Sequence, residues 1–324
     1  MTTCLFKRPA PGMPCKHYIR LPNKDEPGLC DLPENFHCTE AFKHKIPAIS
    51  VSSAKDFSSC RMKYFYHKVQ GIECKPAKLP EPIKCGKIWD EYMNMVYSGP
   101  DASNESFEKA INTSQLPDYT AAKLQGLIYA FQELNIHVDL ANCQRVLNAN
   151  ILTSNVIGVV DRDYSDYFVE TKLSSRPNFY DHLESIHFQA GAYFLLNPSY
   201  EHMILEVTRL PGLKQKPDES INAFASRIKS DIIKRPSYYF IGLNRKTLRF
   251  GRKYMRSEFN LDKIKKTFQI ISQDIQRAVV SDEWYENELA CHSPSNCMYL
   301  PIHRTGAISE SIYQMQDKDR KVKK

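Results

Sequence analysis

The spacing of apolar residues changes from one region of the chain to the next. Over 54–69, 87–97 and 118–135 the sequence predicts helices, and in the third stretch apolar residues recur at steps of three and four. From 142 to 174 apolar and polar residues alternate and many are β-branched, which predicts a meander of strands. Beyond it the sequence predicts helices over 183–197, 221–236 and 261–280, a strand over 201–210 and a strand pair over 238–255.

This order of elements indicates a fold class. Helices, a strand meander, a helix and a further strand describe an α/β protein with a mixed central sheet flanked by helices. We expect the compact domain over 46–305. Residues 1–45 are rich in Pro, Cys and Lys without either periodicity, so they form a separate Cys-rich module. Residues 306–324 form a charged tail that we expect to be disordered.

Composition and charge exclude some classes of protein. The 324 residues contain no run approaching the roughly 18 apolar residues that span a bilayer, and the first fifteen lack the apolar centre of a secretion signal. We therefore expect no membrane partner and a reducing, cytoplasmic compartment. With 44 Lys and Arg against 37 Asp and Glu, the net charge of +7 permits a polyanionic partner without identifying one.

Residues 158–174, GVVDRDYSDYFVETKLS, read as a hairpin with charges on its strands. If the turn is centred on Ser165–Asp166, antiparallel pairing places Asp161 opposite Glu170, with Cβ atoms about 5 Å apart. Carboxylates this close repel each other, and a cation between them relieves the repulsion. Lys172 shares a face with Glu170 because side chains repeat every two residues along a strand. The hairpin therefore predicts a Mg²⁺ or Mn²⁺ site, and the alternative is a surface hairpin with an ordinary Lys–carboxylate pair.

Three further positions give the hairpin a context. Gln189 and Tyr193, in FQAGAY, are four residues apart and share a face of a predicted helix. Asp90 follows Gly86 by four residues in CGKIWDEY. The order G-x-x-x-D, then E-x-K after a short turn, then Q-x-x-x-Y resembles the PD-(D/E)XK nuclease superfamily, specifically its RecB-like branch. The resemblance covers about residues 50–305, and it lies in the ordered combination rather than in any one motif.

The resemblance implies a restriction-endonuclease-like core and a role for each matching position. Two carboxylates and the carbonyl after the second would ligate Mg²⁺ or Mn²⁺, a lysine would be catalytic, and a Gln–Tyr pair would contact the DNA strand or orient that lysine. In this chain these residues are Asp161, Glu170, Thr171, Lys172, Gln189 and Tyr193. The branch usually has a His where this chain has Asp90. A carboxylate ligates a hard cation at least as well, so Asp90 is kept as a metal ligand, although the departure leaves that assignment open.

A second group of residues lies in CHSPSNCMYLPIHR, which supplies Cys291, Cys297 and His303. A subset of RecB-like nucleases, including CRISPR-associated and recombination-complex members, holds a [4Fe–4S] cluster on one early Cys and three late ones. Cys60, in SSCRMKYFY, resembles the early Cys, and His303 stands in the place of the last one. The resemblance implies a structural cluster. A Cys₃His zinc site uses the same donors, and unligated cysteines are the third alternative.

The N-terminal module contains four more cysteines, Cys4, Cys15, Cys30 and Cys38. Four thiolates suffice for tetrahedral Zn²⁺, and folding around a metal would order a segment that has no core of its own. The segment lacks the C-x₂-C spacing that makes zinc sequences specific, so a flexible arm and packed thiols remain the alternatives.

These features together predict a metal-dependent deoxyribonuclease. The resemblance to CRISPR-associated and phage RecB-like exonucleases implies action on single-stranded DNA or DNA ends, in the cytosol of a bacterium or a phage-infected host. The sequence has no Walker A motif, so any unwinding requires a helicase or recombination partner. The competing class is an inactive, metal-stapled DNA-binding or scaffold subunit of a recombination, replication or defence complex, which the Asp at the His position favours. An enzyme that acts on RNA is a third, weaker alternative.

Overall fold

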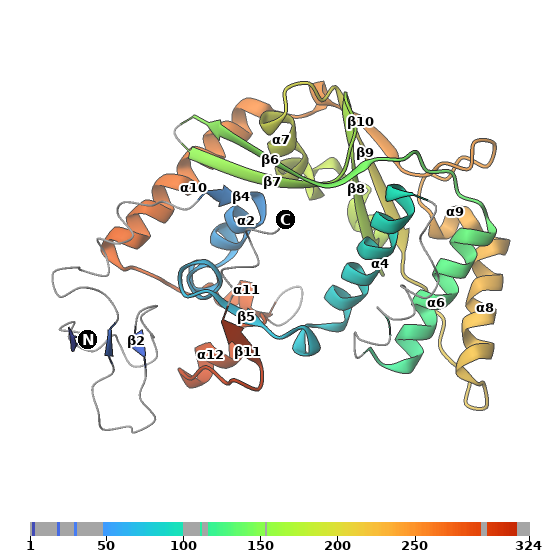
Figure 1. Cartoon of the computed structure of the whole chain (residues 1–324), viewed down its shortest axis with the longest axis horizontal. Coiled ribbons are helices and arrows are strands. Elements are labelled where there is room, and N and C mark those ends of the chain that lie inside the picture. Colours follow the sequence, from blue (N-terminus) through green and yellow to red (C-terminus); the bar gives the residue numbers. More distant parts are fainter. Residues whose placement is uncertain are drawn as a thin grey trace. The chain divides into compact units, whose positions relative to one another are not determined.

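The structure is a computed structural model that describes residues 48–99, 111, 116–152, 154–292 and 297–315, and three short strands nearer the N-terminus. The chain forms two compact units. The first comprises Met1–Lys78, Asn150–Val156 and Lys266–Lys324, and the second comprises Leu79–Ala149 and Ile157–Lys265. Figure 1 labels the elements of both.

A mixed sheet forms the centre of the second unit. Its strands lie in the order β10-β9-β8-β7, and β6 pairs with β7. Strands β8 and β9 are parallel, whereas β7 and β10 run antiparallel to their neighbours β8 and β9. The strand bounds are Asn142–Ile151 for β6, Ser154–Asp163 for β7, Tyr167–Ser174 for β8, His202–Arg209 for β9 and Arg252–Met255 for β10.

The register of the β7–β8 hairpin agrees with the sequence-based prediction. Arg162 pairs with Val169 and Asp163 with Phe168, so the next position along the two strands brings Asp161 opposite Glu170. The turn between the strands therefore centres on Ser165–Asp166, as predicted.

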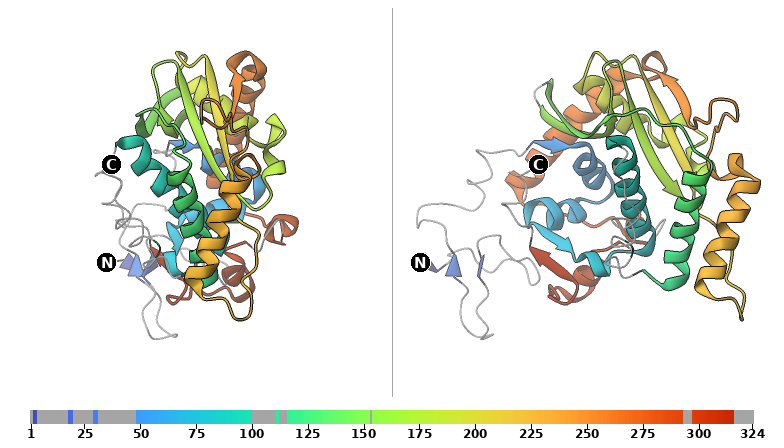
Figure 2. Two further views of the ribbon diagram at one scale, coloured as in Figure 1. Left: turned by 90° about the vertical axis from the view of Figure 1, so that its right-hand side faces the viewer. Right: turned by 45° about the vertical axis from the view of Figure 1, so that its right-hand side comes forward.

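Three helices cover one face of the sheet: α4 (Glu81–Ser98), α6 (Asp118–Glu133) and α8 (Ile221–Lys234). Their apolar faces share one buried core, to which Trp89, Phe131 and Phe240 contribute. Figure 2 shows α6 and α8 side by side. Gly126 permits this close packing, because a Cβ atom there would lie 2.7 Å from the Ala225 carbonyl oxygen of α8.

Helix α7 (His187–Leu196) packs on the other face. Phe168 of β8 is buried against Tyr193 and Phe194 of this helix. The helix predicted over 183–197 is thus shorter, since 3₁₀ turns at η3 (Pro177–Tyr180) and η4 (Leu183–Ser185) occupy the connection that precedes it. Helices on both faces of a mixed sheet confirm the predicted α/β class.

The predicted strand pair over 238–255 is only partly present. Short helix α9 (Pro236–Tyr239) precedes a turn, and β10 alone is a strand. Gly242 and Gly251 both have positive φ, and a Cβ on Gly242 would lie 2.6 Å from the Gly251 carbonyl oxygen. This close backbone approach replaces the expected strand with a tight turn.

In the first unit, the helix predicted over 54–69 is broken at Cys60, whose extended backbone separates α2 (Val51–Ser59) from α3 (Arg61–Tyr64). The unit continues with a π-helix, η1 (Phe65–Val69), and β5 (Ile72–Cys74), and strand β4 (Ile49–Ser50) precedes α2. Most of α10 (Leu261–Ser281) belongs to it, and a 3₁₀ turn, η2 (Pro76–Lys78), ends its first segment. The later elements are α11 (Glu288–His292), α12 (Leu300–Thr305) and β11 (Tyr313–Met315).

The structure has strands in two stretches for which the sequence predicts no strand, the charged tail and the N-terminal module. Strand β11 falls within the stretch predicted as a disordered tail, yet it pairs antiparallel with β5, Tyr313 opposite Cys74. Near the N-terminus, β1 (Thr2–Thr3) and β2 (Tyr18–Ile19) each pair with β3 (Leu29–Cys30). The remainder of the predicted zinc module lies outside the described residues. No helix in the described part of the chain is long and apolar enough to cross a membrane.

Candidate nuclease site

The structure brings the predicted catalytic residues together in the second unit. Strand β7 carries Asp161, and β8 carries Glu170, Thr171 and Lys172. Side chains of Glu170 and Lys172 point to the same face of the sheet as Phe168, the face that α7 covers, because they lie two and four residues further along β8. Asp161 shares that face, since it is opposite Glu170 in the register.

A chain of hydrogen bonds links β8 to α7. The buried carboxylate of Glu170 is paired with the Lys172 ammonium and accepts a hydrogen bond from Gln189 Nε2 at 2.6 Å. The same Nε2 lies 3.1 Å from the Tyr193 hydroxyl, which donates to the Val159 carbonyl at 2.7 Å. The i,i+4 spacing on α7 thus places both side chains over β8, as the sequence predicts.

The ammonium of Lys172 is held in its charged form. Burial lowers the pKa of Lys172, but the negative charges of Glu170 and Asp161 raise it by more, so the pKa lies well above its ordinary value. In the metal-free protein these two carboxylates therefore favour the charged form of Lys172.

Asp161 is oriented by the hairpin itself. Its Oδ2 atom accepts a hydrogen bond from the Thr171 backbone N–H at 2.9 Å and lies 3.8 Å from the Arg162 guanidinium. The neighbouring Asp163 has other partners: it accepts hydrogen bonds from Arg145 at 2.6 Å and from the Tyr200 hydroxyl. Of these two Asp residues, only Asp161 remains adjacent to the Glu170–Lys172 pair.

A buried arginine that the sequence did not predict lies on the opposite face of the sheet and contacts residues of the site. Arg162 is 0% exposed and faces α4. Its Nη1 donates to the Thr171 hydroxyl at 2.8 Å and lies 3.3 Å from Asp90 Oδ1, and its guanidinium lies over the Tyr97 ring at 5.0 Å. Asp90 of α4 is therefore linked to the site by its ion pair with Arg162.

A buried glutamate, also missed, lies beside this arginine. Glu206 of β9 pairs across the parallel register with Thr171, accepts a hydrogen bond from its hydroxyl at 3.3 Å, and accepts another from the Tyr97 hydroxyl. Burial raises the pKa of Glu206 to about 7, although Tyr97 and Arg162 oppose the shift. Burial and the charge of Asp161 likewise raise the pKa of Asp90. Acidic groups are therefore crowded around one guanidinium.

The donor set fits a hard cation. Asp90, Asp161 and Glu170 offer carboxylate oxygens and Thr171 a carbonyl, the ligand types that Mg²⁺ and Mn²⁺ prefer. Burial and then the charge of Asp161 raise the pKa of Asp90, and a divalent ion would relieve the repulsion between these two carboxylates. Within the described residues, however, no three His, Cys, Asp or Glu side chains are already arranged to hold a metal ion.

The second predicted metal group lies wholly in the first unit. Cys60 and Cys291 are buried, and Cys297 is partly buried. Burial raises the pKa of the Cys291 and Cys297 thiols, and the nearby Cys60 thiol raises both further. The Cys291 sulfur lies 3.9 Å from Nδ1 of His303.

His303 is buried, and among the described residues the cysteine group too is not arranged to hold a metal ion. Its side chain is 3% exposed, and its buried Nε2 atom has no hydrogen-bond partner. Burial lowers the pKa of His303, which favours the neutral imidazole that metals bind. Three thiols and one imidazole are soft and borderline donors, suited to iron–sulfur or zinc and not to Mg²⁺.

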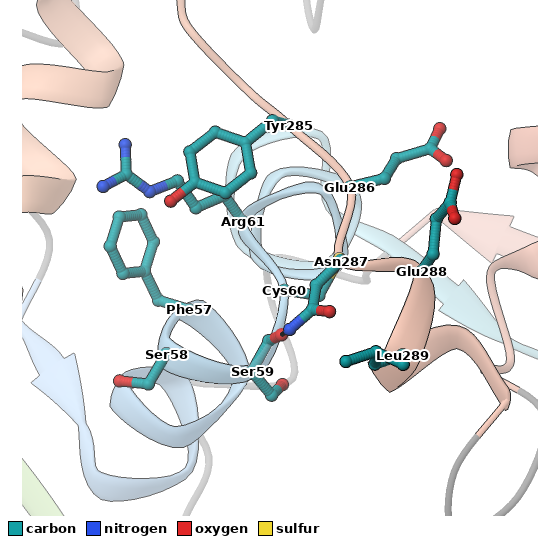
Figure 3. Close-up of a pocket in the computed structure, with 10 residues that line it drawn as sticks. All are labelled: Phe57, Ser58, Ser59, Cys60, Arg61, Tyr285, Glu286, Asn287, Glu288 and Leu289. Carbon is teal, nitrogen blue, oxygen red and sulfur yellow. Dashed lines mark hydrogen bonds between the residues drawn. The ribbon is translucent and has the colours of Figure 1, made fainter.

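A hollow of about 390 Å³ in the first unit is lined in part by Cys60. Figure 3 shows that Arg61 lies beside the rings of Phe57 and Tyr285 along its rim. Cys60 lines the hollow together with Glu286 and the residues that follow it. Of the cysteine group, only Cys60 lines the hollow, and none of the predicted catalytic residues does.

Comparisons with known proteins add a low-similarity likeness to a solved structure. No family model and no curated protein matches the chain. A crystal structure from Eubacterium rectale, described as a "putative exonuclease", is similar over 91% of this chain and 99% of its own, with a TM-score of 0.43 and 10% sequence identity. A likeness at this TM-score does not identify a function, so the residues of the site must do so.

Proposed function

We propose that the protein is a Mg²⁺- or Mn²⁺-dependent deoxyribonuclease that hydrolyses phosphodiesters of single-stranded DNA or DNA ends. One observation carries the proposal: the register of β7 and β8 places Asp161 opposite Glu170, while Gln189 of α7 and Lys172 both contact the Glu170 carboxylate. Two carboxylates, an ammonium and an amide from β7, β8 and α7 thus meet at one point, which supports a role in phosphodiester cleavage.

Each residue has a stated task. Asp161, Glu170, Asp90 and the Thr171 carbonyl would hold the metal ion. When bound, the ion supplies a positive charge for the phosphate and lowers the pKa of a water molecule. Lys172 would stabilise the negative charge that grows on the phosphate oxygens, or orient the attacking water. Gln189 fixes Glu170 and is itself fixed by Tyr193.

The cysteine group has a structural task in this proposal. Cys60, Cys291, Cys297 and His303 would hold a [4Fe–4S] cluster, with Zn²⁺ as the alternative, and would join α11 and α12 to the break between α2 and α3. The N-terminal cysteines would hold Zn²⁺. A helicase or recombination protein would supply the unwound strand, and the cytoplasm would be the site of action.

One observation favours a second candidate, an inactive DNA-binding subunit. Asp90 stands where the related nucleases have a His, and it is engaged by Arg162 at 3.3 Å. If that ion pair persists when metal is present, the site lacks one ligand.

The test uses DNA labelled at either end, single- or double-stranded, with Mn²⁺ or Mg²⁺. Wild type is compared with Glu170→Gln, and with Glu201→Gln as a control at an exposed carboxylate just before β9. We expect cutting by wild type and the control, and loss of cutting in Glu170→Gln with an unchanged circular dichroism spectrum. If wild type binds DNA but cuts with neither ion, the inactive subunit is the correct reading.

A further inference from the structure

Arg209, the last residue of β9, lies on the same face of the sheet as the predicted catalytic residues. Strands β8 and β9 are parallel, and Arg209 is aligned with Ser174, the last residue of β8. Ser174 is two residues beyond Lys172, so all three project to one face. The alternate positions agree, because Leu173 and Leu210 pack against the core that covers the other face.

The position of Arg209 is close to the proposed site. Two residues along a strand and one step to the neighbouring strand separate the Cα atoms of Lys172 and Arg209, a distance of about 8 Å. Ligands of α/β sheets bind outside the carboxyl ends of parallel strands, where Arg209 lies. A phosphate next to the scissile one would therefore come within reach of its side chain.

The Arg209 guanidinium is held in place by Tyr238 of α9. Its Nε donates to the Tyr238 carbonyl oxygen at 3.1 Å, and its Cζ lies 4.2 Å from the centroid of the Tyr238 ring. The segment that carries Tyr238 is itself anchored to β9, because Phe240 forms a β-bridge with Thr208. The guanidinium is therefore ordered before any ligand binds.

The rest of the Arg209 fork is available to an anion. Within the described part of the chain, Arg209 forms no ion pair, and Nε is the only one of its nitrogens that donates to another residue. Its Nη1 and Nη2 atoms keep their N–H groups in the planar arrangement that matches two oxygens of a phosphate. A preorganised arginine of this kind loses less entropy when it binds phosphate than a free side chain does.

A second guanidinium increases the positive charge at this point. The Cζ atom of Arg235 lies 4.5 Å from the centroid of the same Tyr238 ring. The carboxylate of Asp231 binds Arg235 at 2.9 and 2.8 Å and also accepts a hydrogen bond from the Tyr239 hydroxyl. Two guanidiniums thus share one carboxylate, which leaves the charge of Arg209 unbalanced, and one phosphodiester would balance it.

We propose that Arg209 binds the DNA phosphate that neighbours the scissile one, with Tyr238 holding its guanidinium in place. Arg209 is a positioning residue: its contact with the neighbouring phosphate keeps the strand where the scissile phosphate meets Lys172. The contact fixes the position of the strand without reading its sequence, because every linkage presents the same phosphate. This inference rests on the proposed nuclease function and adds a binding site away from the reacting atoms.

The salt dependence of binding tests this contact, in the Glu170→Gln background with Mg²⁺ so that the strand is not cut. Fluorescence anisotropy measures the Kd of a labelled oligothymidylate over a series of salt concentrations. Each neutralised phosphate releases counterions, so the slope of log K against log salt reports the number of contacts. The variants are Arg209→Gln and Arg209→Lys. The matched control is Lys123→Gln, which removes a cation that lies 5.6 Å from the Tyr119 ring on α6, in the helical layer on the other face of the sheet.

We expect Arg209→Gln to weaken binding by about 10-fold and to reduce the slope by about 0.7, the loss of one phosphate contact on a single strand. Arg209→Lys keeps a point charge but not the planar fork, so it should weaken binding and keep the slope. The Lys123→Gln control should change neither quantity. Thermal unfolding should give the wild-type Tm for all three variants.

The outcomes separate this inference from the proposed function. A wild-type slope for Arg209→Gln, an equal loss of slope in Arg209→Lys, or an equal loss in the Lys123→Gln control overturns the phosphate site, while metal-dependent cutting by wild type leaves the nuclease standing. If wild type neither binds nor cuts DNA, both fall.

Discussion

Glu206 allows a quantitative test of the electrostatics beneath the site. Its carboxylate is buried between Tyr97 and Thr171, and burial raises its pKa from 4.5 to about 7. Ionising Glu206 therefore costs about 3 kcal/mol more in the folded protein than in the unfolded chain. Between the two pKa values the folded protein keeps a proton that the unfolded chain has lost. The contribution of Glu206 to the stability of the metal-free protein should accordingly fall as the pH rises from about 4.5 to about 7.

The substitution Glu206→Gln removes the charge and keeps the shape: the amide oxygen can accept the hydrogen bond from Tyr97, and the amide N–H can donate to the Thr171 hydroxyl oxygen in place of the bond that Oε2 accepts. We expect it to flatten this decline. At about pH 8 the variant should be more stable than wild type by as much as about 3 kcal/mol, reduced by the attraction that Arg162 loses. At about pH 4, where Glu206 is protonated in both states, the two proteins should differ little.

Urea unfolding in EDTA measures the effect. Trp89 is buried in the core of the second unit, so its fluorescence reports on that unit in a Trp284→Phe background. The exposed Glu201→Gln substitution is the control, and its pH profile should match that of wild type. Parallel pH profiles for wild type and Glu206→Gln would refute the reasoning, because the buried carboxylate would then have no raised pKa.

Two further predictions concern packing and metal. Gly126→Ala should destabilise the second unit by about 1–3 kcal/mol in the same urea assay, because the new Cβ meets the fixed Ala225 carbonyl. The matched substitution Gly86→Ala adds a Cβ that meets nothing within 4 Å, so it should stabilise the unit by about 0.5–1 kcal/mol. Cys297→Ser should lower the iron or zinc content of anaerobically purified protein, measured by elemental analysis and absorbance near 400 nm, while Cys143→Ser should not; equal metal content in both variants would remove the cysteine group as a site.

The hairpin illustrates what the sequence determines. A short polar turn between two alternating strands leaves few registers, and the pairing of Arg162 with Val169 is the predicted one. Helical spacing likewise brings Gln189 and Tyr193 together. Local periodicity was sufficient for each of these features because the interacting residues are near one another in the sequence.

The buried charges on the other face could not be predicted in this way. A Glu within the apolar strand EHMILEVTRL and an Arg between two Asp residues are visible signals, because charges in a buried strand require partners. Their partner Tyr97, however, lies 109 residues from Glu206. Tertiary packing of α4 on the sheet decides that contact, and no periodicity encodes it.

The composition of the two units has a consequence for synthesis on the ribosome. The first unit is built from segments that precede and follow the second unit in the sequence. Its strand β5 pairs with β11, which is synthesised more than two hundred residues later. The second unit is complete once Lys265 has emerged. Domains generally fold as units during synthesis, so the carboxylate site should form before Cys291, Cys297 and His303 reach Cys60. A ribosome that stalls after α10 would release a chain with a finished carboxylate site and an unclosed cysteine site.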